Sequence, residues 1–215
     1  MIDNIELIIH NALKIKYQNN IIYFDPFKLK NKSKNIEIAN YIFITHSHFD
    51  HYSEEDINLI KDDNTKIIIP SDLEDKVIEL GFKKENVLVV KPNNKYQIDD
   101  IKFETVRAYN INKDFHKKEY DWVGYVITLN DERIYIAGDT DNTEEARNVK
   151  CDIAFVPIGG IYTCDYKDAI ELVKAIKPKI AVPTHYNSIV GSREDGYRFK
   201  EGLDNIVQVL LLLKK

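Results

Sequence analysis

The feature that most constrains this chain is a short loop that holds three of its six histidines. The compact apolar run Tyr41–Thr45 predicts a buried strand, and it leads directly into His46-Ser47-His48-Phe49-Asp50-His51. An H-x-H-x-D-H pattern should arise by chance in about 4 of 10,000 chains of this composition. Four such side chains cost free energy when they are buried together without a cation. Since imidazole and carboxylate are natural ligands of divalent metals, the loop predicts a metal site.

The spacing within this loop favours two metal ions rather than one. In an extended loop His46 and His48 point to the same side, so together they can bind one ion. Asp50 and His51 lie on the following turn and would face a neighbouring position.

Two further candidate ligands follow predicted strands elsewhere in the chain. Asp139 comes after the run Arg133–Ala137, and His185 comes after Lys179–Pro183. Strand ends are where the active sites of α/β folds gather. A carboxylate such as Asp139 can bridge two cations about 3.5–4 Å apart.

The order of apolar runs predicts an α/β fold and a single domain over residues 1–215, with meander strands first in each half and strand–helix units after them. Strands are expected at Ile5–His10, Ala12–Tyr17, Ile21–Phe24, Lys66–Pro70, Val87–Val90, Tyr96–Ile98, Ile101–Tyr109, Trp122–Thr128 and Ile153–Pro157. Ser53 and Ser71 are expected to cap helices, and Tyr166–Ile176 has helical spacing. The polar stretch Asn110–Asp121 is too long for a tight hairpin, so it is a candidate functional loop.

The composition excludes several other classes of protein. Apolar residues make up 44% of the chain, and 13 Tyr with 9 Phe supply ample surface to bury, which argues against disorder. The net charge of −5 disfavours a general nucleic-acid binder. The run Ile206–Leu213 is far shorter than the ~20 residues that span a bilayer, so it predicts a buried final strand. Cys151 and Cys164 lack CxxC spacing and are expected to be inert. With no targeting segment visible, we expect a cytoplasmic protein without membrane partners.

Three motifs together resemble the metallo-β-lactamase superfamily of metal-dependent hydrolases. They are HSHFDH, then Gly138-Asp139-Thr140, then Pro183-Thr184-His185-Tyr186, and the resemblance runs over nearly the whole chain. Three further segments are similar to the branch that contains ascorbate-6-phosphate lactonase and, more distantly, N-acylphosphatidylethanolamine phospholipase D. These segments are Asp25-Pro26-Phe27, the WVGYVI run from Trp122, and Pro157–Gly160.

The resemblance implies an αββα four-layer sandwich, in which two mixed β-sheets are flanked by helices and the metals lie at one edge of the sheets. It implies one or two divalent ions (Zn, Mn or Ni) and the metal ligands His46, His48, Asp50, His51, Asp139 and His185. The family usually places another histidine where this chain has Asn110. Asparagine is a poor zinc ligand but a tolerable oxygen donor for harder ions. His10 and His116 are the histidines that could replace the missing one.

The expected reaction is hydrolysis by a metal-bound hydroxide. Asp50 would hold or deprotonate the water, and His185 or a second metal would stabilise the oxyanion or the leaving group. The substrate would be a small molecule, including an anionic one: a lactone, a phosphodiester or another ester or amide. Alternatives are a non-catalytic metal-binding or assembly module with a partly degenerate site, and a nuclease. Relatives in this branch are often oligomers, so a homo-oligomer is also expected.

Two weaker hypotheses concern groups around these ligands. Asp25 could orient a ligand histidine or simply form its turn. Lys113, Lys117 and Lys118 surround His116, and they could attract an anionic substrate or form an ordinary solvated loop.

Overall fold

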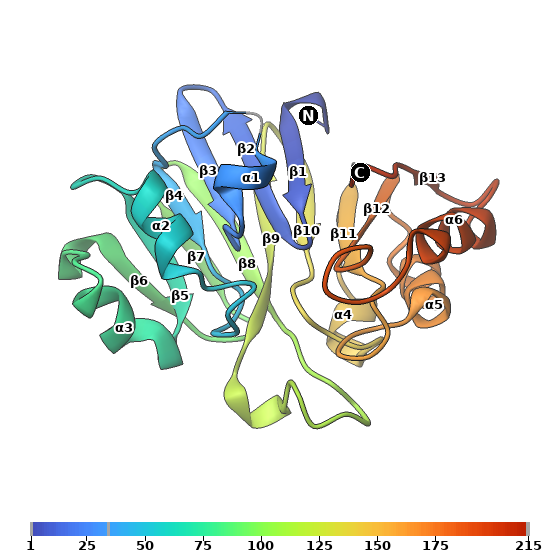
Figure 1. The fold of residues 1–215 in the computed structure, drawn as a ribbon. Helices are drawn as coiled ribbons and strands as arrows, with labels where there is room; N and C mark the ends of the chain where they lie inside the picture. Colours follow the sequence, from blue (N-terminus) through green and yellow to red (C-terminus); the bar gives the residue numbers. More distant parts are fainter. Residues whose placement is uncertain (1, 34, 214–215) are drawn as a thin grey trace. The chain divides into compact units, whose positions relative to one another are not determined.

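The computed structural model describes residues 2–33 and 35–213. The chain divides into two compact units, a first that extends to Val90 and a second over Lys91–Leu213, and each is described by itself. Each unit contains one mixed β-sheet and its own helices (Figure 1). The prediction of a single domain over residues 1–215 stays a prediction.

The first unit is built on a six-stranded sheet of order β1-β2-β3-β4-β5-β6. Its strands are β1 Ile5–Ile9, β2 Ala12–Tyr17, β3 Asn20–Phe24, β4 Tyr41–Phe43, β5 Lys66–Pro70 and β6 Val87–Val90. Its helices are η1 Ile2–Asn4, α1 Leu29–Lys32, α2 Glu54–Ile60, η2 Ser71–Leu73, α3 Glu74–Glu79 and η3 Lys84–Asn86. The β1-β2-β3 pairs are antiparallel and the β3-β4-β5-β6 pairs are parallel, which confirms the predicted N-terminal meander.

The core of the first unit lies between its sheet and the helices α2 and α3 (Figure 1). Ile57 and Ile60 of α2 and Val77 of α3 are fully buried against β4 and β5. Each such side chain contributes about 1.5–3 kcal/mol by leaving water. Ser53 caps α2 as predicted, because its hydroxyl accepts from the Asp56 backbone N–H at 3.3 Å.

The second unit repeats this plan in a seven-stranded sheet of order β13-β12-β11-β10-β9-β8-β7. Its strands are β7 Lys95–Ile98, β8 Ile101–Arg107, β9 Val123–Leu129, β10 Glu132–Ile136, β11 Ile153–Pro157, β12 Ile180–Thr184 and β13 Gln208–Val209. Its helices are η4 Lys118–Tyr120, α4 Glu144–Arg147, α5 Tyr166–Ile176 and α6 Arg193–Gly202. The β7-β8-β9-β10 pairs are antiparallel and the β10-β11-β12-β13 pairs are parallel, which confirms the prediction that meander strands come first in this half too.

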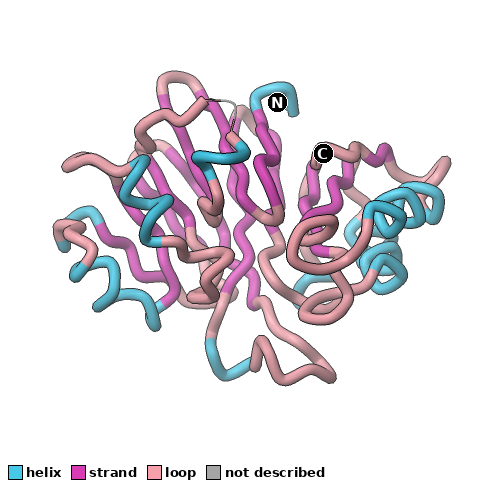
Figure 2. Tube along the Cα trace, viewed as in Figure 1, coloured by secondary structure: helices cyan, strands magenta, loops and turns pink. Residues whose placement is uncertain are grey.

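Helix α5 shows why the second unit folds as its sequence predicts. Asp165 begins the helix by accepting backbone N–H bonds from Lys167 and Asp168, and Leu172 and Val173 face the buried core. The helix ends at Ile176, and the next residue, Lys177, has a left-handed conformation and precedes Pro178. Figure 2 shows that the connection between β8 and β9 is loop apart from one short helical turn, as expected for Asn110–Asp121.

The structure corrects several predicted strand ends, three of them by two residues or more. Strand β4 ends at Phe43, because the Thr45 backbone N–H binds the Asp25 side chain instead of a neighbouring strand. Strand β8 ends at Arg107, because the Asn110 N–H binds the His116 carbonyl within the loop. The predicted final strand over Ile206–Leu213 is wrong in extent: only Gln208–Val209 pair with β12, and the residues after them are partly exposed.

Two mixed sheets with helices confirm the predicted α/β class. Over the residues that the structure describes, no helix combines the length and apolar character needed to cross a membrane.

Candidate metal centre

The first cluster consists of His10, Asp25, His46, His48, Asp50 and His51, all in the first unit. The loop after β4 brings His46 Nε2 to 3.1 Å from His48 Nδ1. Two nitrogen ligands of one tetrahedral zinc ion lie about 3.3 Å apart, given Zn–N bonds of about 2.0–2.1 Å. The pair is therefore spaced as two ligands of one metal ion would be, in agreement with the predicted pairing of His46 with His48.

Asp25 lies fully buried at the centre of the first cluster. Its carboxylate accepts bonds from the Thr45 N–H and hydroxyl, each at 2.8 Å, and from Asn11 Nδ2 at 2.9 Å. A fourth bond, of 2.7 Å, joins it to His51 Nδ1. A carboxylate can only accept, so His51 Nδ1 carries a proton and, in the neutral ring, Nε2 carries the lone pair.

Thr45 determines which nitrogen of His46 carries the proton. Its hydroxyl proton points to Asp25, so the Thr45 oxygen can only accept from His46 Nδ1, which is 3.0 Å away. In His46 too, Nε2 is left with the lone pair of the neutral ring. Asp25 thus orients His51 directly and His46 through Thr45, an arrangement typical of the groups that support metal ligands. This favours the orienting role among the two hypotheses for Asp25.

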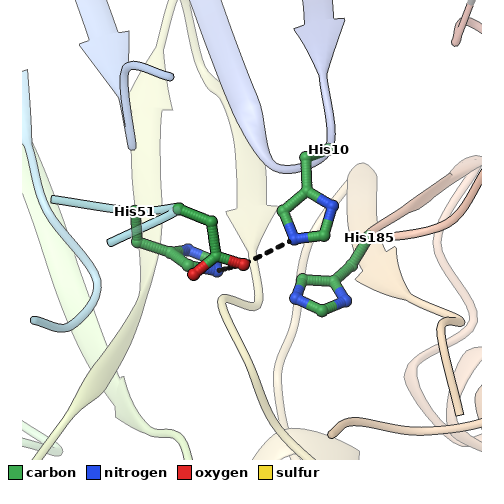
Figure 3. Close-up of side chains that lie close together, drawn as sticks. His10, His51 and His185 are labelled. Atoms are coloured by element: carbon green, nitrogen blue, oxygen red, sulfur yellow. Dashed lines mark hydrogen bonds and ion pairs between the residues drawn. The ribbon is translucent and has the colours of Figure 1, made fainter. Parts of the chain in front are cut away.

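His10 and Asp50 form a further contact of the first cluster (Figure 3). His10 Nε2 lies 3.0 Å from Asp50 Oδ2, and His51 Nε2 lies 3.9 Å from the same oxygen. Ligand atoms of these three residues all lie within 4.8 Å of one another. His10 has a left-handed conformation (φ 55°) in the turn between β1 and β2, which is uncommon for a residue with a side chain. The turn therefore aims a buried imidazole at Asp50.

The second cluster consists of Asn110, His116, Asp139 and His185, all in the second unit. His185, labelled in Figure 3, follows β12 and lies with its Nε2 2.9 Å from Asp139 Oδ2. His116 Nε2 lies 3.2 Å from the same oxygen. All three side chains are buried. One carboxylate oxygen thus faces two imidazole nitrogens, an arrangement suited to a carboxylate that bridges two cations.

Asn110 takes part in the second cluster through His116. Its Oδ1 lies 3.0 Å from His116 Nδ1 and accepts from the His116 backbone N–H at 3.1 Å. Its Nδ2 donates to the Tyr162 carbonyl at 2.8 Å. Both ends of the amide are therefore engaged by groups of the chain itself.

Gly159 leaves the space that His185 occupies. A Cβ at this position would overlap the His185 carbonyl oxygen and lie 2.9 Å from His185 Nδ1. His185 itself is left-handed (φ 56°), a conformation that costs free energy unless its surroundings fix it. The turn after β11 therefore helps to fix the imidazole.

Sequence reasoning missed three residues that support the clusters: Asn11, Thr45 and Gly159. Thr45 directly precedes the histidine motif, so its place next to the motif was a usable signal. Asn11 reaches Asp25 only because β1 and β2 form a hairpin, and one sequence carries no sign of that contact.

The lysines of the loop are compensated by carboxylates. Lys113 pairs with Asp141 and donates to the Thr163 carbonyl at 3.0 Å. Lys118 lies 3.2 Å from Glu145. Two of the three lysines thus have an acidic partner, which weakens the hypothesis that they attract an anionic substrate.

The cysteines fit the predicted inert role. Burial raises the pKa of Cys151 to about 12 and raises that of Cys164 well above its usual value. A thiol that stays protonated is a poor nucleophile and a poor metal ligand.

Comparison with known proteins agrees with these motifs. Residues 4–185 match the family model of the Beta-lactamase superfamily domain. A UPF0173 protein from Pyrococcus abyssi is 30% identical over 88% of this chain and 86% of its own length. A UPF0173 metal-dependent hydrolase from Thermoplasma acidophilum is 32% identical over 83% of this chain and 81% of its own.

The fold is similar to that of a Parabacteroides distasonis protein named as a metal-dependent hydrolase. Its crystal structure matches with a TM-score of 0.85 and 28% identity, over 98% of this chain and 93% of that chain. The family match covers most of the residues, including every predicted ligand from His10 to His185. The chain therefore belongs to the UPF0173 family of metal-dependent hydrolases, within the metallo-β-lactamase superfamily.

Proposed function

We propose that the protein hydrolyses a small ester-type substrate, and that the imidazoles and the Asp50 and Asp139 carboxylates of both clusters ligate one or two divalent ions. The observation that carries the proposal is the 2.7 Å bond from Asp25 to His51 Nδ1, which leaves Nε2 of that buried ring as a ligand. Burying several histidines and a carboxylate in one loop costs free energy unless a cation binds them.

The donor set fits a borderline divalent cation. In the first cluster, His51 Nε2, which carries the lone pair in the neutral ring, lies 3.9 Å from Asp50 Oδ2, and both cysteines have raised pKa values. Nitrogen and oxygen donors without thiolate suit Zn, Mn or Ni. We propose one of these three as the physiological metal.

We propose a catalytic role for one residue of each cluster, Asp50 and His185. When bound, the cation supplies a water activated near neutral pH and polarises the scissile bond. Asp50, fixed by His10, would orient this water and accept its proton. His185, fixed beside Asp139, would stabilise the developing negative charge or protonate the leaving group.

For the substrate we propose a lactone as the first choice. The DPF, WVGYVI and PIGG segments resemble the lactonase branch, and the pairing of two of the three loop lysines with carboxylates weakens a local reason to prefer an anion. Phosphodiesters and other esters or amides remain substrates to test. We also propose a cytoplasmic, homo-oligomeric enzyme that acts on small molecules and uses neither nucleic acid nor membrane.

The test combines metal analysis with hydrolysis assays on lactone, phosphodiester and thioester panels. We expect bound metal in the purified protein and turnover of at least one panel. His48→Ala should lower both metal content and activity, whereas Glu74→Ala on the exposed surface of α3 should change neither. Unchanged metal content and activity in His48→Ala would refute the proposed site. Bound metal without turnover on any panel would favour a non-catalytic metal-binding module.

A further inference from the structure

We infer that His116 is the metal ligand that replaces the histidine missing at position 110, and that Asn110 is the residue that positions it. The inference deepens the proposed function and rests on metal binding by the second cluster. It assigns a role to each of the two residues that depart from the family pattern.

The burial of His116 is the first reason. Its side chain is 1% exposed, although it lies in a loop whose neighbouring apolar residues Ile111 and Phe115 are 57% and 45% exposed. The imidazole packs against Trp122, with the ring centroids 5.6 Å apart. A loop that buries a histidine while it leaves isoleucine and phenylalanine in water is not organised by apolar burial. The polar contacts of His116 must therefore account for its position.

The Asn110 amide fixes which nitrogen of His116 carries the proton. Asn110 Oδ1 faces a certain donor, the His116 backbone N–H, and Nδ2 faces a certain acceptor, the Tyr162 carbonyl. These two contacts set the orientation of the amide without any assumption about the ring. The atom 3.0 Å from His116 Nδ1 is therefore an oxygen, so Nδ1 is the donor. In the neutral ring Nε2 then carries the lone pair.

Nε2 of His116 faces the carboxylate that already faces His185, and a lone pair at this nitrogen is favourable there only if a cation lies between the two atoms. His116 Nε2 lies 3.2 Å from Asp139 Oδ2, and His185 Nε2 lies 2.9 Å from that oxygen. Two imidazole nitrogens and one carboxylate oxygen form a ligand set for a divalent cation of the Zn, Mn or Ni class.

The loop brings position 116 to the place where β8 ends. The Asn110 N–H donates to the His116 carbonyl at 2.7 Å, and Asn110 Oδ1 accepts the His116 N–H, so the two residues close a ring of contacts. A histidine six residues later is thereby held beside the position from which the family usually supplies one. His10, the other candidate, bonds Asp50 in the first cluster.

The experiment measures metal binding rather than turnover. Metal-free wild-type protein and variants are titrated with Zn²⁺ and Mn²⁺ by calorimetry, metal content is counted by mass spectrometry, and the Co²⁺ absorption spectrum reports the ligand field. His116→Gln and His116→Ala should each lower the affinity of one metal equivalent by about 100-fold and alter the Co²⁺ spectrum. Lys117→Ala, at the neighbouring exposed position, should match wild type.

Asn110 is tested with two variants of similar size. Asn110→Leu removes the acceptor and should weaken metal binding by about 10- to 100-fold. Asn110→Asp keeps an acceptor at His116 Nδ1 and should stay within about 3-fold of wild type. A purely structural role for Asn110 would instead leave metal affinity and the Co²⁺ spectrum unchanged in both variants.

The outcomes separate this inference from the proposed function. Wild-type affinity and spectrum in both His116 variants, with circular dichroism showing them folded, would overturn the inference even if the enzyme hydrolyses its substrate. Metal loss in the His116 variants without turnover by wild type would support the inference and contradict the proposed hydrolysis. A wild-type protein that binds no metal would overturn both.

Discussion

Both clusters contain a histidine whose Nδ1 is bound by an oxygen acceptor, but the acceptor differs between them. In the first cluster the Asp25 carboxylate binds His51 Nδ1, and in the second the Asn110 amide oxygen binds His116 Nδ1. Each acceptor leaves Nε2 of its ring as the candidate ligand. The acceptor on one side is charged and serves four donors, whereas on the other it is neutral and has one partner at each end besides the ring.

We call the residue that accepts from Nδ1 of a ring, Asp25 or Asn110, the holder of that ring. The difference between the two holders indicates how strongly the position of each ring depends on them. Bonds to a carboxylate are stronger than bonds to an amide, and a holder that serves four donors cannot change without leaving several of them unpaired. We expect a substitution of Asp25 to destabilise the whole first cluster and to lower the free energy of unfolding. We expect the second cluster to lose metal binding while its fold persists.

The largest expected effect follows from Asp25→Asn. The new amide presents an NH₂ group where the carboxylate accepted, so at least one buried donor loses its partner whichever way the amide turns. Each unsatisfied buried donor costs about 1–3 kcal/mol, and the bonds that remain are no longer charge-assisted, so we expect a loss of about 3 kcal/mol in the free energy of unfolding. Urea unfolding of the metal-free protein measures it. A change below about 1 kcal/mol would show that Asp25 does not organise the first cluster.

Removal of the metal should have the next largest effect. A ligand present at about 100 times its dissociation constant stabilises the folded state by about 2.7 kcal/mol. Chelation should therefore lower the melting temperature of wild type, and readdition of metal should restore it. Asn110→Leu should show a smaller shift than wild type at the same metal concentration, because its second cluster binds metal more weakly. Equal shifts in the two proteins would mean that the second cluster adds nothing to metal-dependent stability.

Gly159→Ala tests the second cluster from the side of His185. The added methyl group would overlap backbone at the end of β12, so the imidazole must move. Such overpacking costs about 1–3 kcal/mol, and we expect weaker metal binding with it. Gly202→Ala is the matched control, because its methyl group would meet the flexible end of the Ile170 side chain and not backbone. Calorimetry with Zn²⁺ should separate the two variants, and equal affinities would argue against a positioning role for Gly159.

The same contrast explains what could be predicted from sequence. The first cluster lies largely in one motif, so local spacing was enough to predict the pairing of His46 with His48. Most strands and α5 followed from apolar periodicity, since burial decides those elements. The residues of the second cluster come from a loop and two strand ends. No local sequence pattern indicates the bond between Asn110 and His116, or the need for a glycine at position 159 beside His185. Strand ends were missed where a side chain, such as that of Asp25, takes over a backbone bond.

The smallest effect is expected for Asn110→Asp, which is the reverse of the Asp25 substitution. The new carboxylate keeps both bonds to His116 and makes them charge-assisted, while the donation to the Tyr162 carbonyl is lost. One lost bond costs about 1 kcal/mol and the new carboxylate oxygen faces the Tyr162 carbonyl oxygen, whereas the stronger bonds to His116 offset part of this cost. Urea unfolding of the metal-free protein should therefore show a loss of about 1 kcal/mol. If the loss were as large as that of Asp25→Asn, exchange between amide and carboxylate would cost the same free energy at both positions. The proposed difference between the two clusters would then be wrong.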